Sequence, residues 1–246
     1  MLTEIYVFMV LILSSFLQTA TGFGYAIITA PLLALALGPK ETVMITMLTG
    51  LIIRLFMIRA TKHDGSFKAI FPLISSSVLG AIPGAYVMTK ISNQNLKIFI
   101  ALVLLIAATA LWKNFQLTIR HHRLTETIVG GLSGFLATTT SINGPPIILY
   151  YLNSRAEENK SVFRGNLTRY FLLINIASIV ISYIAGTLKI NELWFRTLLS
   201  IPALYIGFYL GEKLFHRINP EIFRKASLIM VFISSIALMV ATLIKN

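Results

Sequence analysis

Cysteine is absent from the 246 residues of this chain. Its absence excludes disulfide bonds, thiolate metal sites and a cysteine nucleophile, although it does not identify a cellular compartment. Acidic residues are scarce as well, since Asp and Glu together number only 9. No group of histidine and carboxylate side chains has the spacing of a metal site. We therefore expect neither a bound metal nor a cofactor.

Charged residues make up only 12% of the chain, whereas a soluble domain usually has about 25%. Hydrophobic residues make up 56%, and the mean hydropathy is +0.80. Such a chain cannot cover a water-facing surface, so we predict an all-α polytopic membrane protein with one transmembrane domain over residues 1–246. The net charge of +12 would suggest a nucleic-acid partner in a soluble protein. Here the basic residues fall mostly in short loops, where they set topology, and we expect the lipid bilayer and no nucleic acid as partner.

Six apolar segments are candidates for full crossings of the bilayer: 42–58, 69–89, 96–112, 165–188, 193–210 and 223–244. Two further apolar regions are interrupted, one between 2–18 and 26–37 and the other between 126–137 and 147–152. Each interrupted piece is shorter than the ~20 residues that a spanning helix needs. We predict that each region is a broken helix or a re-entrant hairpin, which gives about eight helical segments in total.

Both interruptions combine helix-breaking residues with hydroxyl and amide side chains. They are Gln18-Thr19-Ala20-Thr21-Gly22-Phe23-Gly24-Tyr25 and Thr138-Thr139-Thr140-Ser141-Ile142-Asn143-Gly144-Pro145-Pro146. A broken helix is tolerated in lipid only against protein or a water-filled cavity, because every backbone polar group needs a partner. One break in each half of a chain is the best sequence indication of a transporter's binding site. The alternative is that these residues merely kink two membrane helices.

Three landmarks recur in the same order in the two halves. Gly50-x-x-x-Arg54 matches Gly165-x-x-x-Arg169, Gly80 and Gly84 match Gly207 and Gly211, and 90–94 matches 217–221. We predict two repeats, residues 1–115 and 124–246. If each repeat is a hairpin followed by three crossings, the second is inverted relative to the first. Inverted repeats place a binding site near mid-membrane at their interface.

The distribution of basic residues predicts the orientation. Most of the 21 lysines and arginines fall in the loops 59–68, 113–123, 153–164 and 212–225, which this topology puts on one side. Their excess places these loops in the cytoplasm and both termini outside, in a multi-pass protein of the cytoplasmic membrane. The Gly-x-x-x-Gly pairs at 80 and 84, 130 and 134, and 207 and 211 predict close helix packing, and they allow a homodimer without requiring one.

The candidate site joins neutral donors from the breaks to two arginines inside predicted spans. Glycine lets the backbone approach a ligand, and the free N–H groups of a half-helix N-terminus suit an anion. Arg54 and Arg169 lack a carboxylate partner inside any span, which favours an anionic substrate, although Arg54 is close enough to a loop to snorkel. The candidate substrate-binding residues are Gln18, Thr21, Gly22, Gly24, Tyr25, Arg54, Thr139, Thr140, Ser141, Asn143, Gly144, Pro145 and Arg169.

One motif points to a different chemistry. Gly131-Leu132-Ser133-Gly134 has the pattern of an intramembrane serine protease. A serine nucleophile needs a base within hydrogen-bond reach, and all 4 histidines fall in predicted loops. We therefore do not expect an enzyme.

The sequence Thr21-Gly22-Phe23-Gly24, followed by Pro31, is accompanied in the second half by Gly130, Gly134 and Asn143-Gly144-Pro145-Pro146. Together these motifs resemble the TauE/SafE family, the sulfite exporter or anion permease family, along the whole chain. The resemblance implies a transporter of sulfite, sulfoacetate or other sulfur-containing anions. It implies a site on Gln18, Gly22, Gly24, Pro31, Asn143, Gly144 and Pro145.

We therefore predict a secondary transporter that moves small anions by alternating access around the two broken helices. Two alternatives stay open at this stage. One is an anion channel on the same scaffold, and the other is a non-transporting membrane assembly protein.

Overall fold

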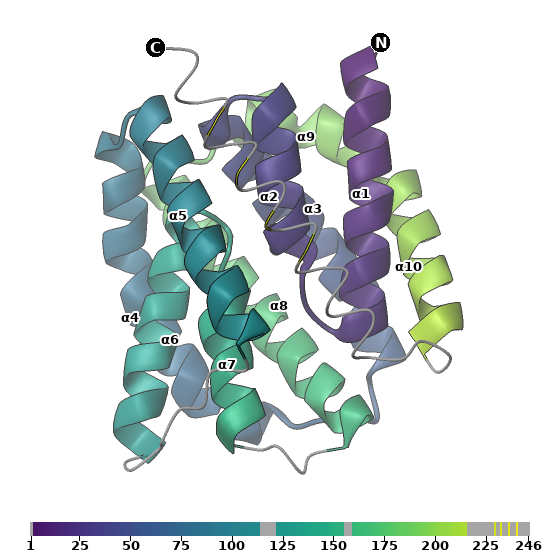
Figure 1. The fold of residues 1–246 in the computed structure, drawn as a ribbon, viewed down its shortest axis with the longest axis vertical. Coiled ribbons are helices and arrows are strands. Elements are labelled where there is room, and N and C mark those ends of the chain that lie inside the picture. The colour runs from purple at the N-terminus through teal and green to yellow at the C-terminus, as the bar shows by residue number, and fades with distance from the viewer. Residues whose placement is uncertain are drawn as a thin grey trace.

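The computed structural model describes residues 2–113, 122–154 and 159–215, and the single positions 229, 232, 236 and 240. Within these ranges all regular secondary structure is α-helical, as predicted (Figure 1). The helices are α1 (Leu2–Thr21), α2 (Tyr25–Ala36), α3 (Pro39–Ala60), α4 (Phe67–Lys90), α5 (Asn93–Trp112), α6 (His122–Thr139), α7 (Gly144–Ser154), α8 (Lys160–Ile184), α9 (Ile190–Leu199) and α10 (Ile201–Phe215).

Six segments of the described chain are long and apolar enough to cross a membrane. They are Leu2–Thr21, Pro39–Ala60, Phe67–Lys90, Asn93–Ala110, Lys160–Ile184 and Leu193–Phe215. The chain is therefore a multi-pass membrane protein, which confirms the fold class. The predicted crossing 223–244 lies outside the described residues, apart from four positions.

The helices begin and end differently from the predicted spans. Helix α3 already begins at Pro39, because proline at the first helical position gives up an N–H that the helix does not use. Helix α8 begins at Lys160, and the Asn159 side chain caps it by accepting from the Ser161 N–H at 2.9 Å. The predicted crossing 193–210 is divided at Ser200 between α9 and α10.

Each interrupted region folds back on itself as a hairpin. The Tyr6 hydroxyl near the start of α1 donates to the Leu32 carbonyl near the end of α2, at 2.9 Å. In the second half, the Tyr150 hydroxyl near the end of α7 donates to Glu126 Oε1 near the start of α6, also at 2.9 Å. The first hairpin enters from the top of Figure 1, and the second enters from the bottom.

The long helices of one half pack on the hairpin of the other half. A Cβ atom on Gly80 of α4 would collide with the Gly131 carbonyl of α6. A Cβ atom on Gly207 of α10 would likewise collide with the Ile12 carbonyl of α1. The glycines therefore allow the close packing that their spacing predicts. The matched pairings support the division into repeats 1–115 and 124–246, which stays a prediction.

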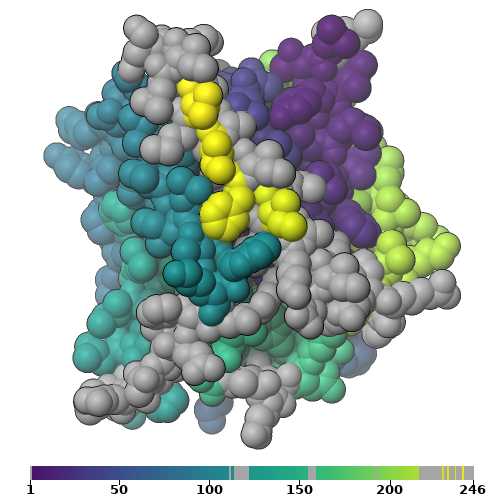
Figure 2. All heavy atoms as spheres, viewed as in Figure 1, coloured from purple at the N-terminus to yellow at the C-terminus, as the bar shows by residue number. Residues whose placement is uncertain are grey.

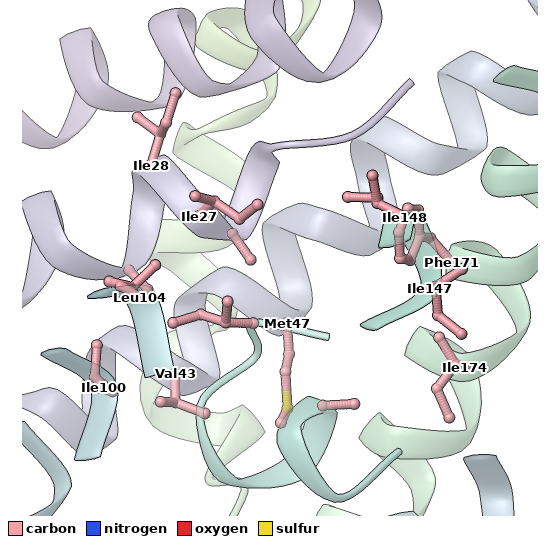
Figure 3. Packing of buried hydrophobic residues seen from close by; sticks show 14 of the residues in the cluster. Ile27, Ile28, Val43, Met47, Ile100, Leu104, Ile147, Ile148, Phe171 and Ile174 are labelled. Carbon is pink, nitrogen blue, oxygen red and sulfur yellow. The ribbon is translucent and has the colours of Figure 1, made fainter. Parts of the chain in front are cut away.

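The two short helices lie at the centre of the molecule. In Figure 3, Ile27 of α2 and Ile147 of α7 belong to one apolar cluster with Met47, Leu104 and Phe171, from α3, α5 and α8. In Figure 2, α1 and α10 form one edge of this face, and the described C-terminal positions lie in a row beside α5. Burial of α2 and α7 leaves their ends without water, so other protein groups must bind the free backbone groups there.

Ion pairs join helices at the two ends of the structure. Arg196 of α9 pairs with Glu4 of α1 at 3.2 Å and with Glu41 of α3. Arg164 of α8 pairs with Glu212 of α10. These pairs connect α9 to α1 and α3 at one end, and α8 to α10 at the other.

Candidate functional site

The first break is the short link between α1 and α2. Gly22 and Gly24 have φ angles of 86° and 103°, a left-handed conformation in which glycine carries no steric penalty. The Gln18 side chain bridges the break: its Nε2 donates to the Gly22 carbonyl at 3.0 Å, and its Oε1 accepts from the Tyr25 N–H at 3.0 Å. One buried amide thus replaces backbone bonds that a continuous helix would have made.

Two further side chains of the first break have partners within the protein. The Thr21 hydroxyl donates to the Leu17 carbonyl at 2.7 Å and lies 2.6 Å from the Phe23 carbonyl. The Tyr25 hydroxyl donates to Thr49 Oγ1 of α3 at 2.6 Å. These bonds anchor the N-terminus of α2 against α3.

The second break runs from Thr140 to Asn143, between α6 and α7. Ser141 has a φ angle of 61°, which is unusual for a residue with a side chain, and its hydroxyl donates to the Val43 carbonyl at 2.9 Å. The hydroxyls of Thr139 and Thr140 donate to α6 carbonyls, at 2.8 and 3.0 Å. Such local strain persists only where surrounding contacts hold it, and it is concentrated at functional sites.

The serine of the protease-like motif also supports the second break. Ser133 Oγ donates to the Asn143 carbonyl at 2.7 Å and accepts from the Tyr170 hydroxyl at 2.8 Å. The same Tyr170 oxygen lies 2.6 Å from Ser77 Oγ of α4. Ser133 is therefore a structural link among α4, α6 and α8, which accounts for the motif without catalysis.

A small cavity lies where α2, α3, α6, α8 and the second break meet. It offers about 10 Å³ to the centre of a water-sized sphere, which is room for about one water molecule. Its wall is mostly polar although it lies within the apolar core. The lining residues are Ala26, Thr46, Met47, Arg54, Ala137, Ser141, Asn143, Asn175 and Ser178.

Arg54 supplies the positive charge of this cavity. The side chain is 4% exposed, so it does not snorkel to the surface. Its guanidinium carbon lies 5.4 Å from the centre of the Phe171 ring, and its Nε has no hydrogen-bond partner in the described ranges. Those ranges also contain no carboxylate paired with Arg54.

Three further polar atoms of the lining are buried without a hydrogen-bond partner in the described part of the chain. They are Thr46 Oγ1, Asn175 Oδ1 and Ser178 Oγ. Buried polar groups are almost always paired with protein, water or a ligand, so these atoms make the cavity a candidate binding site. Arg54 Nε and the two hydroxyls can donate, whereas Asn175 Oδ1 can only accept. The sequence analysis missed all three residues. A usable signal was the spacing of Thr46, Gly50 and Arg54, which puts them on one face of a helix.

The backbone adds positive potential on two sides of the cavity. Ala26 is in the first turn of α2, and Asn143 immediately precedes α7. Both lining residues therefore mark the N-terminal ends of short helices, where the helix dipole favours a negative ligand. Together with Arg54, this arrangement suits a small anion.

The comparison with protein families agrees with this geometry. The family model for the sulfite exporter TauE/SafE matches residues 7–238.

The chain belongs to the sulfite exporter TauE/SafE family.

The resemblance seen in the sequence motifs is thereby confirmed, and the TauE/SafE family is one of membrane transporters. Comparisons with curated proteins and with solved structures give no match.

Of the candidate residues in this TauE/SafE chain, the structure brings Arg54, Ser141 and Asn143 together in the cavity lining. The other residues of the two breaks shape the adjacent backbone. They are Gln18, Thr21, Gly22, Gly24, Tyr25, Thr139, Thr140, Gly144 and Pro145.

Arg169 is not brought to the cavity. Its guanidinium donates to the carbonyls of Thr61 at 3.2 Å, Lys62 at 3.1 Å and Gly165 at 3.1 Å, and to that of Asp64. These carbonyls belong to the end of α3, the loop after it and the first turns of α8. Arg169 therefore binds the protein's own backbone, whereas Arg54, at the matching position of the first predicted repeat, faces the cavity.

Arg164 is a buried cation that the sequence analysis assigned to a loop. It is 4% exposed, pairs with Glu212, and lies over the Phe215 ring with 4.2 Å between the guanidinium carbon and the ring centre. Its Cγ lies 3.1 Å from the place that a Cβ atom on Gly22 would occupy. The side chain of Arg164 thus covers the first break from the loop side.

Proposed function

We propose that this TauE/SafE protein is a secondary transporter of small anions in the cytoplasmic membrane. The substrate class to which its family points is sulfite, sulfoacetate and other sulfonates. The observation that carries the proposal is the buried and unpaired Arg54 in a cavity between the N-terminal ends of α2 and α7.

The lining offers an oxyanion several donors from different helices. Arg54 supplies charge-assisted hydrogen bonds, which are roughly twice as strong as neutral ones. Thr46 and Ser178 supply hydroxyl groups, and Asn175 supplies an amide. A single arginine among neutral donors suits an anion that has to be bound and then released.

The cavity is too small for the proposed substrates, so the helices around it must move apart during transport. About 10 Å³ is open to the centre of a water-sized sphere, so a sulfite or sulfonate group needs a wider site. The two hairpins end at this site and enter from opposite faces, and each is held by side-chain bonds such as those of Gln18 and Ser133. Rocking of the repeats around a central site is the motion that inverted repeats support.

Uptake into proteoliposomes tests the proposal. Purified protein is reconstituted, and uptake of radiolabelled sulfite and sulfoacetate is measured for wild type, Arg54→Gln and Asn143→Ala. We expect saturable uptake by wild type. In Arg54→Gln, kcat/KM should fall by about 10- to 100-fold, the range that corresponds to losing roughly 1.5–3 kcal/mol of hydrogen bonding to a charged group.

Arg59→Gln is the matched control, because Arg59 is an exposed arginine on the same helix. Its uptake should equal that of wild type. Wild-type uptake by both cavity variants would refute the site. Non-saturating flux with single-channel currents would favour an anion channel, and the absence of flux and binding for every anion tested would favour a membrane assembly protein.

A further inference from the structure

The positive charge in the cavity has no counter-charge within the described protein. Arg54 is 4% exposed, and its guanidinium lies over the uncharged ring of Phe171. Arg164, Arg169 and Arg196 differ, since each binds a carboxylate or several backbone carbonyls. Arg54 is thus the one buried arginine of the described ranges that has neither a carboxylate nor a backbone carbonyl partner within them.

A buried charge without a partner is strongly destabilising, and a bound anion removes that penalty. The loaded carrier can close around its cavity as a nearly neutral unit. The unloaded carrier would have to close around a bare guanidinium that has lost its water. Any cycle in which the protein returns without an anion therefore passes through a high-energy conformation.

The lining of the cavity has no side chain that would bind a coupling cation. The cavity lining contains no Asp or Glu, and a cation placed there would be repelled by Arg54. Membrane transporters that bind protons or Na⁺ usually use carboxylates or backbone carbonyls for that purpose. The charge that balances Arg54 during the return step is accordingly an anion.

We infer that this protein is an obligatory anion exchanger, in which export of one anion is coupled to import of another because Arg54 prevents return of the unloaded carrier. This inference rests on the proposed transport function and adds the mode of transport. The incoming ion is of the same chemical class, a small oxyanion such as a sulfonate or a carboxylate that fits the same donors.

Counterflow from proteoliposomes measures the mode of transport directly. Vesicles with reconstituted wild-type protein are loaded with radiolabelled sulfoacetate, which stays ionised and does not cross lipid unaided. They are then diluted into buffer with or without unlabelled sulfoacetate, and uncharged sucrose balances the osmolarity. We expect external sulfoacetate to accelerate efflux by about 100-fold, equivalent to about 2.8 kcal/mol at 1.4 kcal/mol for each factor of ten.

Two variants test whether the acceleration of efflux by external anion depends on the positive charge at residue 54. Arg54→Lys keeps the charge and should keep the acceleration by external anion. Arg54→Gln removes the charge, so its remaining efflux should be the same with and without external anion. Arg59→Gln is the matched surface control and should behave as wild type. Thermal unfolding of each purified variant checks that it is folded.

The outcomes separate this inference from the proposed function. Equal and rapid efflux into both buffers by wild type would contradict obligatory exchange while leaving transport intact. Full acceleration by external anion in folded Arg54→Gln would also overturn the inference. If no protein-dependent efflux occurs in either buffer, both the proposed transport of this anion and the inferred exchange are contradicted.

Discussion

The guanidinium carbon of Arg54 lies 5.4 Å from the centre of the Phe171 ring, so a charge on α3 is covered by an aromatic face on α8. An attraction of this kind contributes about 0.5–2 kcal/mol. It is much weaker than an ion pair and leaves the guanidinium able to bind an anion. The contact therefore holds the arginine in the cavity without neutralising it.

Arg54 and Arg169 occupy matching positions in the two predicted repeats, and we expect their removal to have different effects. Arg169→Gln loses bonds to four backbone carbonyls. The free energy of unfolding should therefore fall by about 1.5–3 kcal/mol, while KM for the anion stays unchanged. Arg54→Gln should weaken anion binding without lowering the stability of the anion-free protein, because it removes an unpaired charge.

Thermal unfolding in detergent and KM in proteoliposomes give the two readings for each variant. A rise in KM with no loss of stability in Arg169→Gln would show that Arg169 binds the substrate after all.

The packing of α4 on α6 should tolerate a methyl group at one glycine and reject it at another. A Cβ atom on Gly80 would collide with the Gly131 backbone, whereas one on Gly131 would lie 4.0 Å from its nearest neighbour, the Ser76 carbonyl. We expect Gly80→Ala to lower stability by about 1–3 kcal/mol, the usual effect of overpacking. Gly131→Ala should be neutral or slightly stabilising. Equal melting temperatures for the two variants would contradict this packing.

We expect Gln18 to stabilise the first break through its hydrogen bonds to the backbone, and not to bind the substrate. Gln18→Leu leaves the buried Tyr25 N–H without the acceptor that it now has at 3.0 Å. An unsatisfied buried donor costs about 1–3 kcal/mol, so we expect a lower melting temperature together with reduced transport. Transport that falls while stability is unchanged would instead indicate that Gln18 binds the substrate directly.

The absence of cysteine permits a direct test of topology. His63→Cys falls in the loop between α3 and α4, and Ser92→Cys falls in the exposed turn between α4 and α5. The distribution of basic residues places the first inside the cell and the second outside. A membrane-impermeant maleimide added to intact cells should therefore label residue 92, and it should label residue 63 only after permeabilisation. The reverse pattern would invert the predicted orientation.

The sequence predicted the two interruptions because their causes are local, although it left open whether each region crosses the bilayer or turns back. Two closely spaced glycines, Gly22 and Gly24, and the consecutive prolines after Gly144 disfavour a continuous helix there. The expectation that every flanking piece is too short to cross was wrong for α1, which extends to Thr21 and is long enough to span a membrane. The glycine pairs at 80 and 84 and at 207 and 211 likewise predicted close packing, although not which helix each pair contacts. That partner is set by how the two halves interlock, which is a property of the whole chain.

The cavity was less predictable than the breaks. Asn175 and Ser178 are single polar residues in a long apolar segment, and only the packing of α8 decides which way they face. Arg169 matches Arg54 in the repeat, yet the loop after α3 provides it with carbonyl partners that Arg54 lacks. The sequence repeat thus predicted that the two arginines lie at matching positions in their helices. It did not predict that one faces the cavity and the other binds backbone carbonyls, because that depends on the surrounding residues.

Substrate protection of a single cysteine in the cavity tests the central claim most directly. Ser178→Cys places a thiol of nearly the same size in the lining of a protein without other cysteines, and Ser92→Cys provides an exposed control. The rate of alkylation by N-ethylmaleimide is measured with and without sulfoacetate, sulfate or a simple carboxylate. We expect the transported anion to slow alkylation at residue 178 by about tenfold or more near saturation and to leave residue 92 unaffected. Equal rates at residue 178 with and without a saturating transported anion would contradict it.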